Sequence, residues 1–274
     1  MTITSDRLIR ITDPEDARIG EFRDIRERDL VGREGRFIAE GTVVLRMLSS
    51  SKRFKADKLL ILENRVEGIT DILERFDADI PIFVCSRSVI DSIAGFPMHR
   101  GVLAAGRAAE TQDLNSALGG MGDDALILVC NGISNHDNMG GLFRNAAAFC
   151  ADLVCLDEEC CDPMYRKAIR VSVGAALTVP FTRQLSIEVI LRTLIDHGFD
   201  IIALSPDAKV SIQNVEPGRR CALVVGTEGS GICQSALELS RTIRIPQAQD
   251  IDSLNVATAA ALALFFVASG QGRI

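Results

Sequence analysis

The stretch that decides the fold is ALILVC at Ala125–Cys130, followed directly by NGISNHDNMGGLFR at Asn131–Arg144. Six apolar residues without polar alternation are typical of a parallel strand that is covered on both faces. The asparagines and glycines that follow predict a loop, which leads into an alanine-rich helix at Asn145–Cys150. Because open parallel sheets bind ligands beyond the carboxyl ends of their strands, this loop is a candidate site.

Further apolar runs of the same kind follow along the chain. They are Leu153–Leu156, Leu177–Phe181, Ile201–Leu204, Ala222–Val225 and Thr242–Ile245. Between two of these runs, apolar residues recur at helical spacing and predict a helix with one apolar stripe. The stripe consists of Ile187, Ile190, Leu191, Leu194 and Ile195. We therefore expect an α/β fold whose second half is a mostly parallel sheet with helices on both faces.

The first half also alternates between predicted strands and helices, which indicates a second α/β layer. A helix is expected to begin at Asp13-Pro14 and to run to about Arg28. The strands are predicted at Arg36–Ala39, Lys58–Leu62, Ile80–Cys85 and Val102–Ala105, and further helices at Gly41–Leu48 and Ile69–Phe76. Because few large apolar residues follow Ala108, the predicted division is one domain at residues 1–107, a linker at 108–123 and a second domain at 124–274.

The composition is that of a globular protein, with 274 residues, 47% of them hydrophobic and 24% charged. The longest apolar stretch, Leu254–Ala268, is shorter than the roughly 18 residues of a membrane span and is expected to be a buried core helix. The N-terminus has no apolar run of the length that a signal peptide needs, so a cytoplasmic location without membrane attachment is expected.

The eight cysteines are expected to be reduced, structural thiols, because no secretory signal accompanies them. Cys150, Cys155, Cys160 and Cys161 suggest a metal site, but they contain no C-x-x-C pair and lie in or beside apolar runs. No metal site is therefore expected.

The net charge of −7 is unusual for a protein that binds nucleic acid. Residues 1–110 carry 18 Lys/Arg and 19 Asp/Glu, whereas residues 111–274 carry 12 and 18. Any basic surface is therefore expected in the first half, where several arginines cluster between Arg18 and Arg36. Acidic residues interleave with them, so a solvated helix face of mixed charge is the alternative.

Three loops that follow predicted strands carry candidate functional residues. In the first, Arg144 would lie one turn into a helix and oppose its dipole, which favours an anionic ligand, although a structural ion pair is the alternative. The second, GTEGSG at Gly226–Gly231, fits neither a dinucleotide motif nor a P-loop, and a plain tight turn is its alternative. In the third, Ser253 is predicted to cap the C-terminal helix, and Asn255 is either a cap partner or a ligand contact.

Taken together, the three loops resemble the signature motifs of the SpoU (TrmH-like) family of SPOUT RNA 2′-O-ribose methyltransferases. The motifs are N-x-G-x-x-x-R at Asn138–Arg144, G-x-E-G at Gly226–Gly229, and I-P with S-L-N-V ending at Val256. RFIAEG at Arg36–Gly41 resembles the family's ribosomal-protein-like substrate-binding domain. One departure is His136-Asp137, where the family usually has Asp-Pro.

The resemblance implies a deep trefoil knot in the C-terminal domain and a homodimer with active sites at the interface. It implies transfer of a methyl group from S-adenosylmethionine to a ribose 2′-hydroxyl of structured RNA, with rRNA favoured over tRNA. The implied cofactor contacts are Leu204, Gly226, Gly229, Ile245 and Leu254. The implied catalytic and RNA-binding residues are Asn138, Arg144, Glu228, Ser253 and Asn255.

Three alternatives to this function stay open. The chain could be a tRNA 2′-O-methyltransferase, a non-catalytic RNA-binding protein on the same fold, or an enzyme of this fold that methylates a base or a small molecule. In the implied reaction, Arg144 stabilises the developing alkoxide, because a guanidinium stays charged in proteins.

Overall fold

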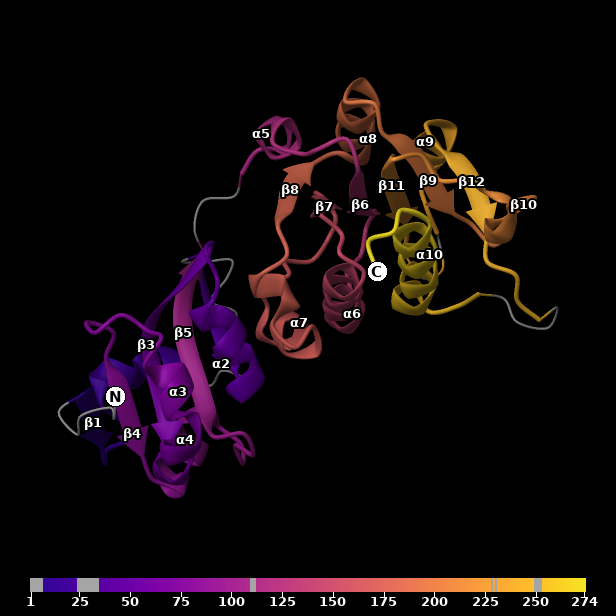
Figure 1. Cartoon of the computed structure of the whole chain (residues 1–274). Helices are drawn as coiled ribbons and strands as arrows, with labels where there is room; N and C mark the ends of the chain where they lie inside the picture. Colours follow the sequence, from indigo (N-terminus) through magenta and orange to yellow (C-terminus); the bar gives the residue numbers. More distant parts are fainter. Residues whose placement is uncertain (1–6, 24–34, 109–111, 228, 230, 249–252) are drawn as a thin grey trace. The chain divides into compact units, whose positions relative to one another are not determined.

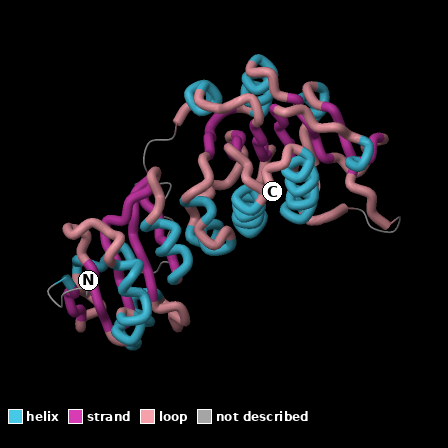
Figure 2. The backbone as a smooth tube through the Cα atoms, viewed as in Figure 1, coloured by secondary structure: helices cyan, strands magenta, loops and turns pink. Residues whose placement is uncertain are grey.

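The computed structural model describes residues 7–23, 35–108, 112–227, 229, 231–248 and 253–274. The chain divides into two compact units (Figures 1 and 2). The first comprises Met1–Glu110 with Asp162–Thr178, and the second comprises Thr111–Cys161 with Val179–Ile274.

The first unit is built on a mixed five-stranded sheet in the order β1-β4-β3-β5-β2. Strand β4 pairs in parallel with β1 and β3, whereas β5 pairs in antiparallel with β3 and β2. The strands are β1 (Leu8–Ile11), β2 (Arg36–Glu40), β3 (Phe54–Leu62), β4 (Ile82–Cys85) and β5 (Val102–Ala108), and the α-helices are α2 (Thr42–Ser49), α3 (Thr70–Leu73) and α4 (Arg87–Ala94). The predicted α/β layer is confirmed, and β1 and α4 are additions to it.

The helix predicted to begin at Asp13-Pro14 is wrong in the described part of the chain. A turn follows Asp13, and a short 3-10 helix runs from Ala17 to Phe22. Its cap is Asp16, whose side chain accepts a hydrogen bond from the backbone N–H of Arg18 (2.9 Å). Both aspartates can cap, so the sequence alone did not decide between them. The rest of the predicted helix, including Arg28, lies outside the described residues.

The second unit contains a seven-stranded sheet in the order β10-β12-β9-β11-β6-β7-β8, and every described pairing in it is parallel. The strands are β6 (Ala125–Cys130), β7 (Leu153–Asp157), β8 (Phe181–Leu185), β9 (Asp200–Leu204), β10 (Val210–Ser211), β11 (Arg220–Val225) and β12 (Arg241–Arg244). β6 is buried along its whole length. The predicted parallel sheet is confirmed.

The strand predicted at Leu177–Phe181 is wrong in its position, because β8 begins only at Phe181. Gly174 has a φ of 87° and starts a 3-10 turn, in which the N–H of Leu177 donates to the Gly174 carbonyl (2.9 Å). Pro180 then has no N–H to donate to a neighbouring strand. Because of the turn and the proline, the strand begins four residues later than predicted, at Phe181.

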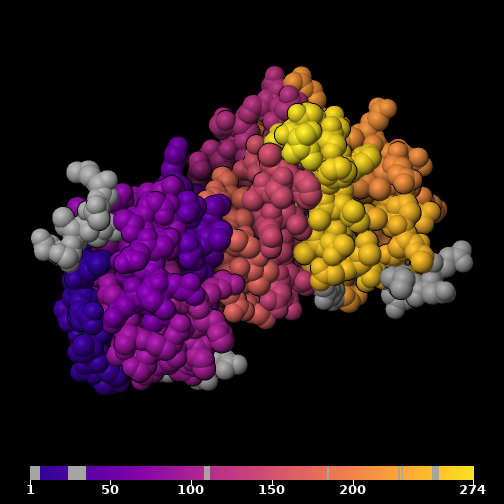
Figure 3. All heavy atoms as spheres, turned by 60° about the horizontal axis from the view of Figure 1, so that its bottom comes forward, coloured from indigo at the N-terminus to yellow at the C-terminus, as the bar shows by residue number. Residues whose placement is uncertain are grey.

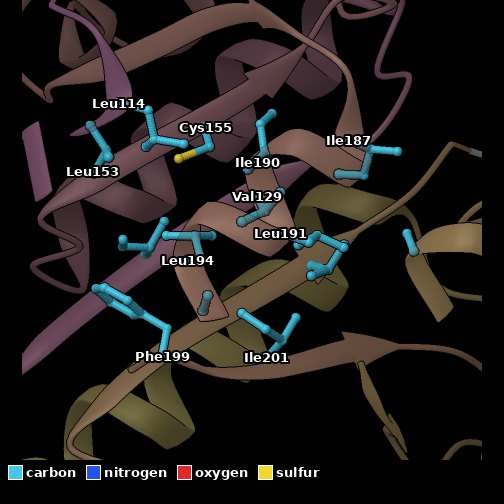
Figure 4. Close-up of a cluster of buried hydrophobic side chains, with 14 of the residues drawn as sticks. Leu114, Val129, Leu153, Cys155, Ile187, Ile190, Leu191, Leu194, Phe199 and Ile201 are labelled. Carbon is cyan, nitrogen blue, oxygen red and sulfur yellow. The ribbon is translucent and has the colours of Figure 1, made fainter. Parts of the chain in front are cut away.

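Helices cover both faces of the parallel sheet (Figure 1). Helices α5 (Leu114–Gly119), α8 (Ile187–Asp196) and α9 (Gln234–Glu238) cover one face, and α6 (His136–Ala148) and α10 (Val256–Gly270) lie side by side on the other. Figure 4 shows part of the core that α8 joins, in which Ile190, Leu191 and Leu194 of the predicted stripe are buried. Ile195, predicted for the same stripe, is 42% exposed instead.

Two segments differ from the predicted domain division. Residues 108–123 contain helix α5, whose Leu114 and Leu118 are buried in the core of the second unit. Residues 162–178, expected in the second domain, are grouped with the first unit. There Arg166 donates to the Glu40 carboxylate (2.5 Å), and the Ser51 hydroxyl donates to the carbonyl of Leu177 (2.7 Å). Both pairs join residues 126 positions apart, so the local sequence pattern could not predict them.

Helix α10 corresponds to the predicted C-terminal core helix. Ala260, Ala263 and Leu264 on one side are buried, but Leu262 and Phe265 on the other are 45% and 53% exposed. The predicted buried core helix is therefore buried on one side only. Among the described residues, no helix combines the length and the apolar character that crossing a membrane requires.

Candidate functional site

A pocket lies at the carboxyl ends of β9, β11 and β12, where a parallel sheet is expected to bind its ligand. Each of these strands contributes the segment that follows it. The residues that line the pocket are Leu204, Ser205, Pro206, Val225, Gly226, Thr227, Gly229, Gly231, Ile232, Ile245, Gln247, Ser253, Leu254, Val256 and Ala259. This set contains all five residues predicted to contact a cofactor, together with Ser253.

The glycine-rich loop after β11 forms one wall of this pocket. Thr227 and Gly231 exchange two backbone hydrogen bonds of 3.1 Å each, which closes the loop on itself. A Cβ atom on Gly226 would lie 2.3 Å from the carbonyl oxygen of Gly231 and 2.5 Å from the backbone nitrogen of Ile232. Only glycine fits at position 226, because the overlapping atoms are backbone atoms.

The helix that follows β6 begins earlier than the sequence indicated. Its cap is Asn135, whose side-chain oxygen accepts hydrogen bonds from the N–H groups of Asp137 (2.8 Å) and Asn138 (3.2 Å). Arg144 is therefore the ninth helical residue, in the third turn of α6. Contrary to the prediction, Arg144 does not oppose the positive end of the helix dipole, because that end acts only within the first turn.

The start of α10 also differs from the prediction. The cap is Asn255, whose side-chain oxygen accepts hydrogen bonds from the N–H groups of Ala257 (3.0 Å) and Thr258 (3.3 Å). Ser253, predicted as the cap, is exposed and lines the pocket instead. Asparagine and serine are similarly good caps, so residue type alone does not show which of the two caps the helix. The cap is Asn255 because the helix begins at Val256.

Asn138 and Asn255 meet although 117 positions separate them. The side-chain N–H of Asn255 donates to the side-chain oxygen of Asn138 (2.9 Å), and Asn138 is only 9% exposed. Seven residues further along α6, the side chain of Asn145 donates to the carbonyl of Ala257 in the first turn of α10 (2.7 Å). A Cβ on Gly141 would lie 2.8 Å from that of Ala257, so the two helices are in close contact.

The structure does not bring Arg144 to the pocket. Arg144 is exposed on α6 and is not among the lining residues. Within the described part of the chain it forms no hydrogen bond or ion pair. Glu228, the remaining predicted catalytic residue, lies outside the described residues.

The buried cysteines carry protonated thiols at neutral pH. Burial raises the pKa of Cys155 to about 12, and it also raises the pKa values of Cys130 and Cys160 well above that of an ordinary thiol. A thiol must lose its proton to bind a metal or to act as a nucleophile, so these residues behave as packing groups. The described residues contain no group of three histidine, cysteine or acidic side chains that could hold a metal ion.

Several pocket residues were not predicted from the sequence. Ser205, Thr227 and Gln247 line the pocket with polar side chains. Each follows closely on a strand of the parallel sheet, within three residues of its end. That position was the available signal, because such loops meet at one edge of the sheet.

Known proteins match the chain across the region that contains the three motifs. The model of the SpoU rRNA Methylase family matches residues 125–265. An uncharacterized tRNA/rRNA methyltransferase of Mycobacterium tuberculosis is 39% identical over 267 residues, which are 93% of this chain and 90% of that protein. A 23S rRNA (guanosine-2′-O-)-methyltransferase of Photobacterium profundum is 29% identical over 198 residues, 71% of this chain and 80% of that protein.

Solved structures share the fold of the chain. The crystal structure of an RNA 2′-O ribose methyltransferase has a TM-score of 0.78 at 25% identity and covers 97% of this chain and 100% of its own. The SpoU methyltransferase AviRb from Streptomyces viridochromogenes, in complex with AdoMet, has a TM-score of 0.80 at 17% identity, over 94% and 100% of the two chains. The resemblance inferred from the three motifs is confirmed. The chain belongs to the SpoU rRNA methylase family.

Proposed function

We propose that this chain transfers the methyl group of S-adenosylmethionine to a ribose 2′-hydroxyl of structured RNA, and that the substrate is ribosomal RNA. The observation that carries the proposal is one pocket to which all the predicted cofactor residues contribute. The relatives named as 23S rRNA methyltransferases support ribosomal RNA over tRNA.

The chemistry of the pocket fits this cofactor. Leu204, Ile245 and Leu254 offer apolar surface for a purine and a hydrocarbon chain, and Thr227 and Gln247 offer polar groups. None of the lining residues that the structure describes is charged, so a phosphate-rich ligand would find no cation there. When bound, S-adenosylmethionine supplies a methyl group that is already activated on a sulfonium sulfur.

The chain's own residues then have to align the ribose and stabilise charge. Asn138 and Asn255 fix the starts of α6 and α10 beside the pocket, and Ser253 lies within it. We assign Arg144 to the oxygen that attacks, because its guanidinium stabilises the negative charge that develops on a ribose alkoxide. Glu228 is proposed to order Arg144 or Asn138.

Arg144 is proposed to act at the pocket of a second copy of the chain. The exposed Leu262 and Phe265 of α10 form an apolar face, which continues to Phe149, whose ring lies 5.9 Å from that of Phe265. Figure 3 shows α10 in yellow beside the surface of α6. An apolar face of this kind favours association with another protein surface, and a homodimer would cover it.

The proposal includes a trefoil knot in the second unit. Helix α10 follows β12 in the chain but packs against α6 and β11, nearer the middle of the sheet. This return path supports a threaded C-terminal segment, which would be one of the rare exceptions to the rule that chains do not thread loops.

Calorimetric titration with S-adenosylmethionine, followed by nucleoside analysis of RNA incubated with the protein, tests the function. Gly226→Ala is expected to abolish binding, because its Cβ would overlap Gly231 in the pocket wall. Gly122→Ala is the matched control, since a Cβ there meets nothing within 4 Å. A wild-type chain that binds no cofactor would refute the proposal and favour a non-catalytic RNA-binding protein, and 2′-O-methylation of tRNA alone would refute ribosomal RNA as substrate.

Co-expression of Arg144→Ala with Gly226→Ala tests whether sites are shared between copies. Each variant alone is expected to be inactive. In a mixed dimer, the intact pocket of one copy would meet the intact Arg144 of the other, so part of the activity should return. Mixed dimers without activity would show that Arg144 does not act across the interface.

A further inference from the structure

Asp157 is a buried carboxylate that the proposed reaction does not use. It ends β7, is 3% exposed and does not line the pocket. Its oxygens accept hydrogen bonds from the side-chain N–H of Asn131 (2.6 Å), from the backbone N–H of Gly132 (3.0 Å) and from that of Glu159 (3.2 Å). These three hydrogen-bond donors are neutral N–H groups. A buried charge needs such donors to offset its lost hydration.

Asn131 extends this network to the wall of the pocket. Its side chain is 6% exposed, and its oxygen accepts a hydrogen bond from the backbone N–H of Cys233 (2.9 Å). Cys233 directly follows Ile232, which lines the pocket. The amide of Asn131 therefore connects the end of β7 to the far end of the loop after β11.

Gly132 holds the near end of the same loop. Its φ is 68°, and a Cβ atom there would lie 2.9 Å from the side-chain methyl of Thr227. The backbone of Gly132 is thus packed against Thr227, which lines the pocket. Asn131 and Gly132 together contact both ends of the segment from Thr227 to Cys233, and Asp157 holds both of them.

The carboxylate also fixes which way the Asn131 amide faces. An ionised carboxylate only accepts hydrogen bonds, so Asn131 must present its NH₂ group to Asp157. Its oxygen is then left for the N–H of Cys233. If the partner were an amide, both side chains could turn over, and the N–H of Cys233 could face a second donor.

From this geometry we propose that Asp157 is a positioning residue for the cofactor loop, which it holds through Asn131 and Gly132. The proposal rests on the function above, because it assigns S-adenosylmethionine to the pocket. Asp157 itself does not line the pocket. Its effect is on the positions of Thr227 and Ile232 in the pocket wall, and hence on cofactor affinity.

The test is calorimetric titration of three variants with S-adenosylmethionine, together with their thermal unfolding. Asp157→Asn is expected to raise the Kd about tenfold, the effect of losing one hydrogen bond to a charged group, while the turnover rate at saturating cofactor stays within about twofold of wild type. The reciprocal exchange, Asn131→Asp together with Asp157→Asn, restores a donor facing an acceptor and an acceptor for Cys233. It is expected to return the Kd to within about threefold of wild type.

Asp152→Asn is the matched control at the opposite end of the same strand. Asp152 accepts a hydrogen bond from the backbone N–H of Leu126 (2.8 Å) and pairs with Arg273 (2.9 Å), away from the pocket. It is expected to lower the unfolding temperature without changing the Kd.

The outcomes separate this inference from the proposed function. A wild-type chain without affinity for S-adenosylmethionine would overturn both. Normal affinity in the Asp157→Asn variant, or an equal loss in Asp152→Asn, would overturn the positioning role alone. If Asp157→Asn does not fold, the exchange variant decides: tight binding supports the proposal, and weak binding by a folded exchange variant overturns it.

Discussion

Replacement of Asn255 separates the two bonds that one side chain makes at the start of α10. Its oxygen caps the helix, and its N–H group binds the side-chain oxygen of Asn138. Asn255→Ala removes both. Loss of the cap costs about 1 kcal/mol. Removing the donor that binds the side-chain oxygen of the 9% exposed Asn138 costs about 1–3 kcal/mol.

Asn255→Ser keeps a cap of similar strength. The shorter serine side chain cannot cap the helix and bind Asn138 at the same time. We therefore expect Asn255→Ala to lower the free energy of unfolding of the second unit by about 2–4 kcal/mol, and Asn255→Ser by about 1 kcal/mol less. Urea denaturation followed by circular dichroism, with one transition fitted for each unit, measures both values.

A double-mutant cycle of Asn255→Ser with Asn138→Ala isolates the bond between the two asparagines. We expect a coupling energy of about 1 kcal/mol, because the residues are in direct contact. A coupling below about 0.3 kcal/mol would refute the bond as a link between the motifs. Equal destabilisation by alanine and serine at position 255 would refute the cap.

Three further predictions concern other parts of the chain. Glu40→Ala removes the partner of Arg166 in a largely buried ion pair, so the free energy of unfolding of the first unit, measured with urea, is expected to fall by about 3–5 kcal/mol. A decrease below about 1 kcal/mol would contradict the pairing. Burial raises the pKa of Cys155 to about 12, so the folded state prefers the neutral thiol. This contribution is complete below pH 9, where the unfolded thiol is protonated, and is lost as the pH rises towards 12. Cys155→Ala should therefore make the free energy of unfolding less dependent on pH above 9, and an unchanged slope would contradict this. Finally, Phe265→Asp should shift the protein to monomers in sedimentation experiments, whereas dimers that persist would place the interface elsewhere.

The strands of the second unit were predictable because a sheet covered on both faces needs continuous apolar runs. Ala125–Cys130 and Ala222–Val225 were found in this way, since every residue in them is buried. The strand expected from Leu177 was not, because apolar residues also fill the buried turn after Gly174. Apolar residues indicate that a segment is buried, but they do not indicate whether it is a strand. After Gly174, which has a left-handed conformation, the buried segment forms a turn instead of a strand.

The candidate site was predictable as a set of loops but not in its internal contacts. Gly226, Ile245 and Leu254 could be placed at one edge of the sheet from the motifs. The capping roles of Asn135 and Asn255 could not, because neighbouring polar residues cap equally well. The contacts of Asp157 depend on which strands are neighbours, and that order is a property of the whole sheet.

The proposed role of Arg144 is to act on the ribose while the pocket holds the cofactor. Its most direct test is nucleoside mass spectrometry of ribosomal RNA incubated with labelled S-adenosylmethionine, with calorimetry on the same samples. Wild-type protein should yield a labelled 2′-O-methyl nucleoside, and Arg144→Ala should yield none while its Kd for the cofactor stays within about twofold of wild type. Undiminished methylation by Arg144→Ala, or a loss of cofactor affinity as large as the loss of rate, would contradict the account.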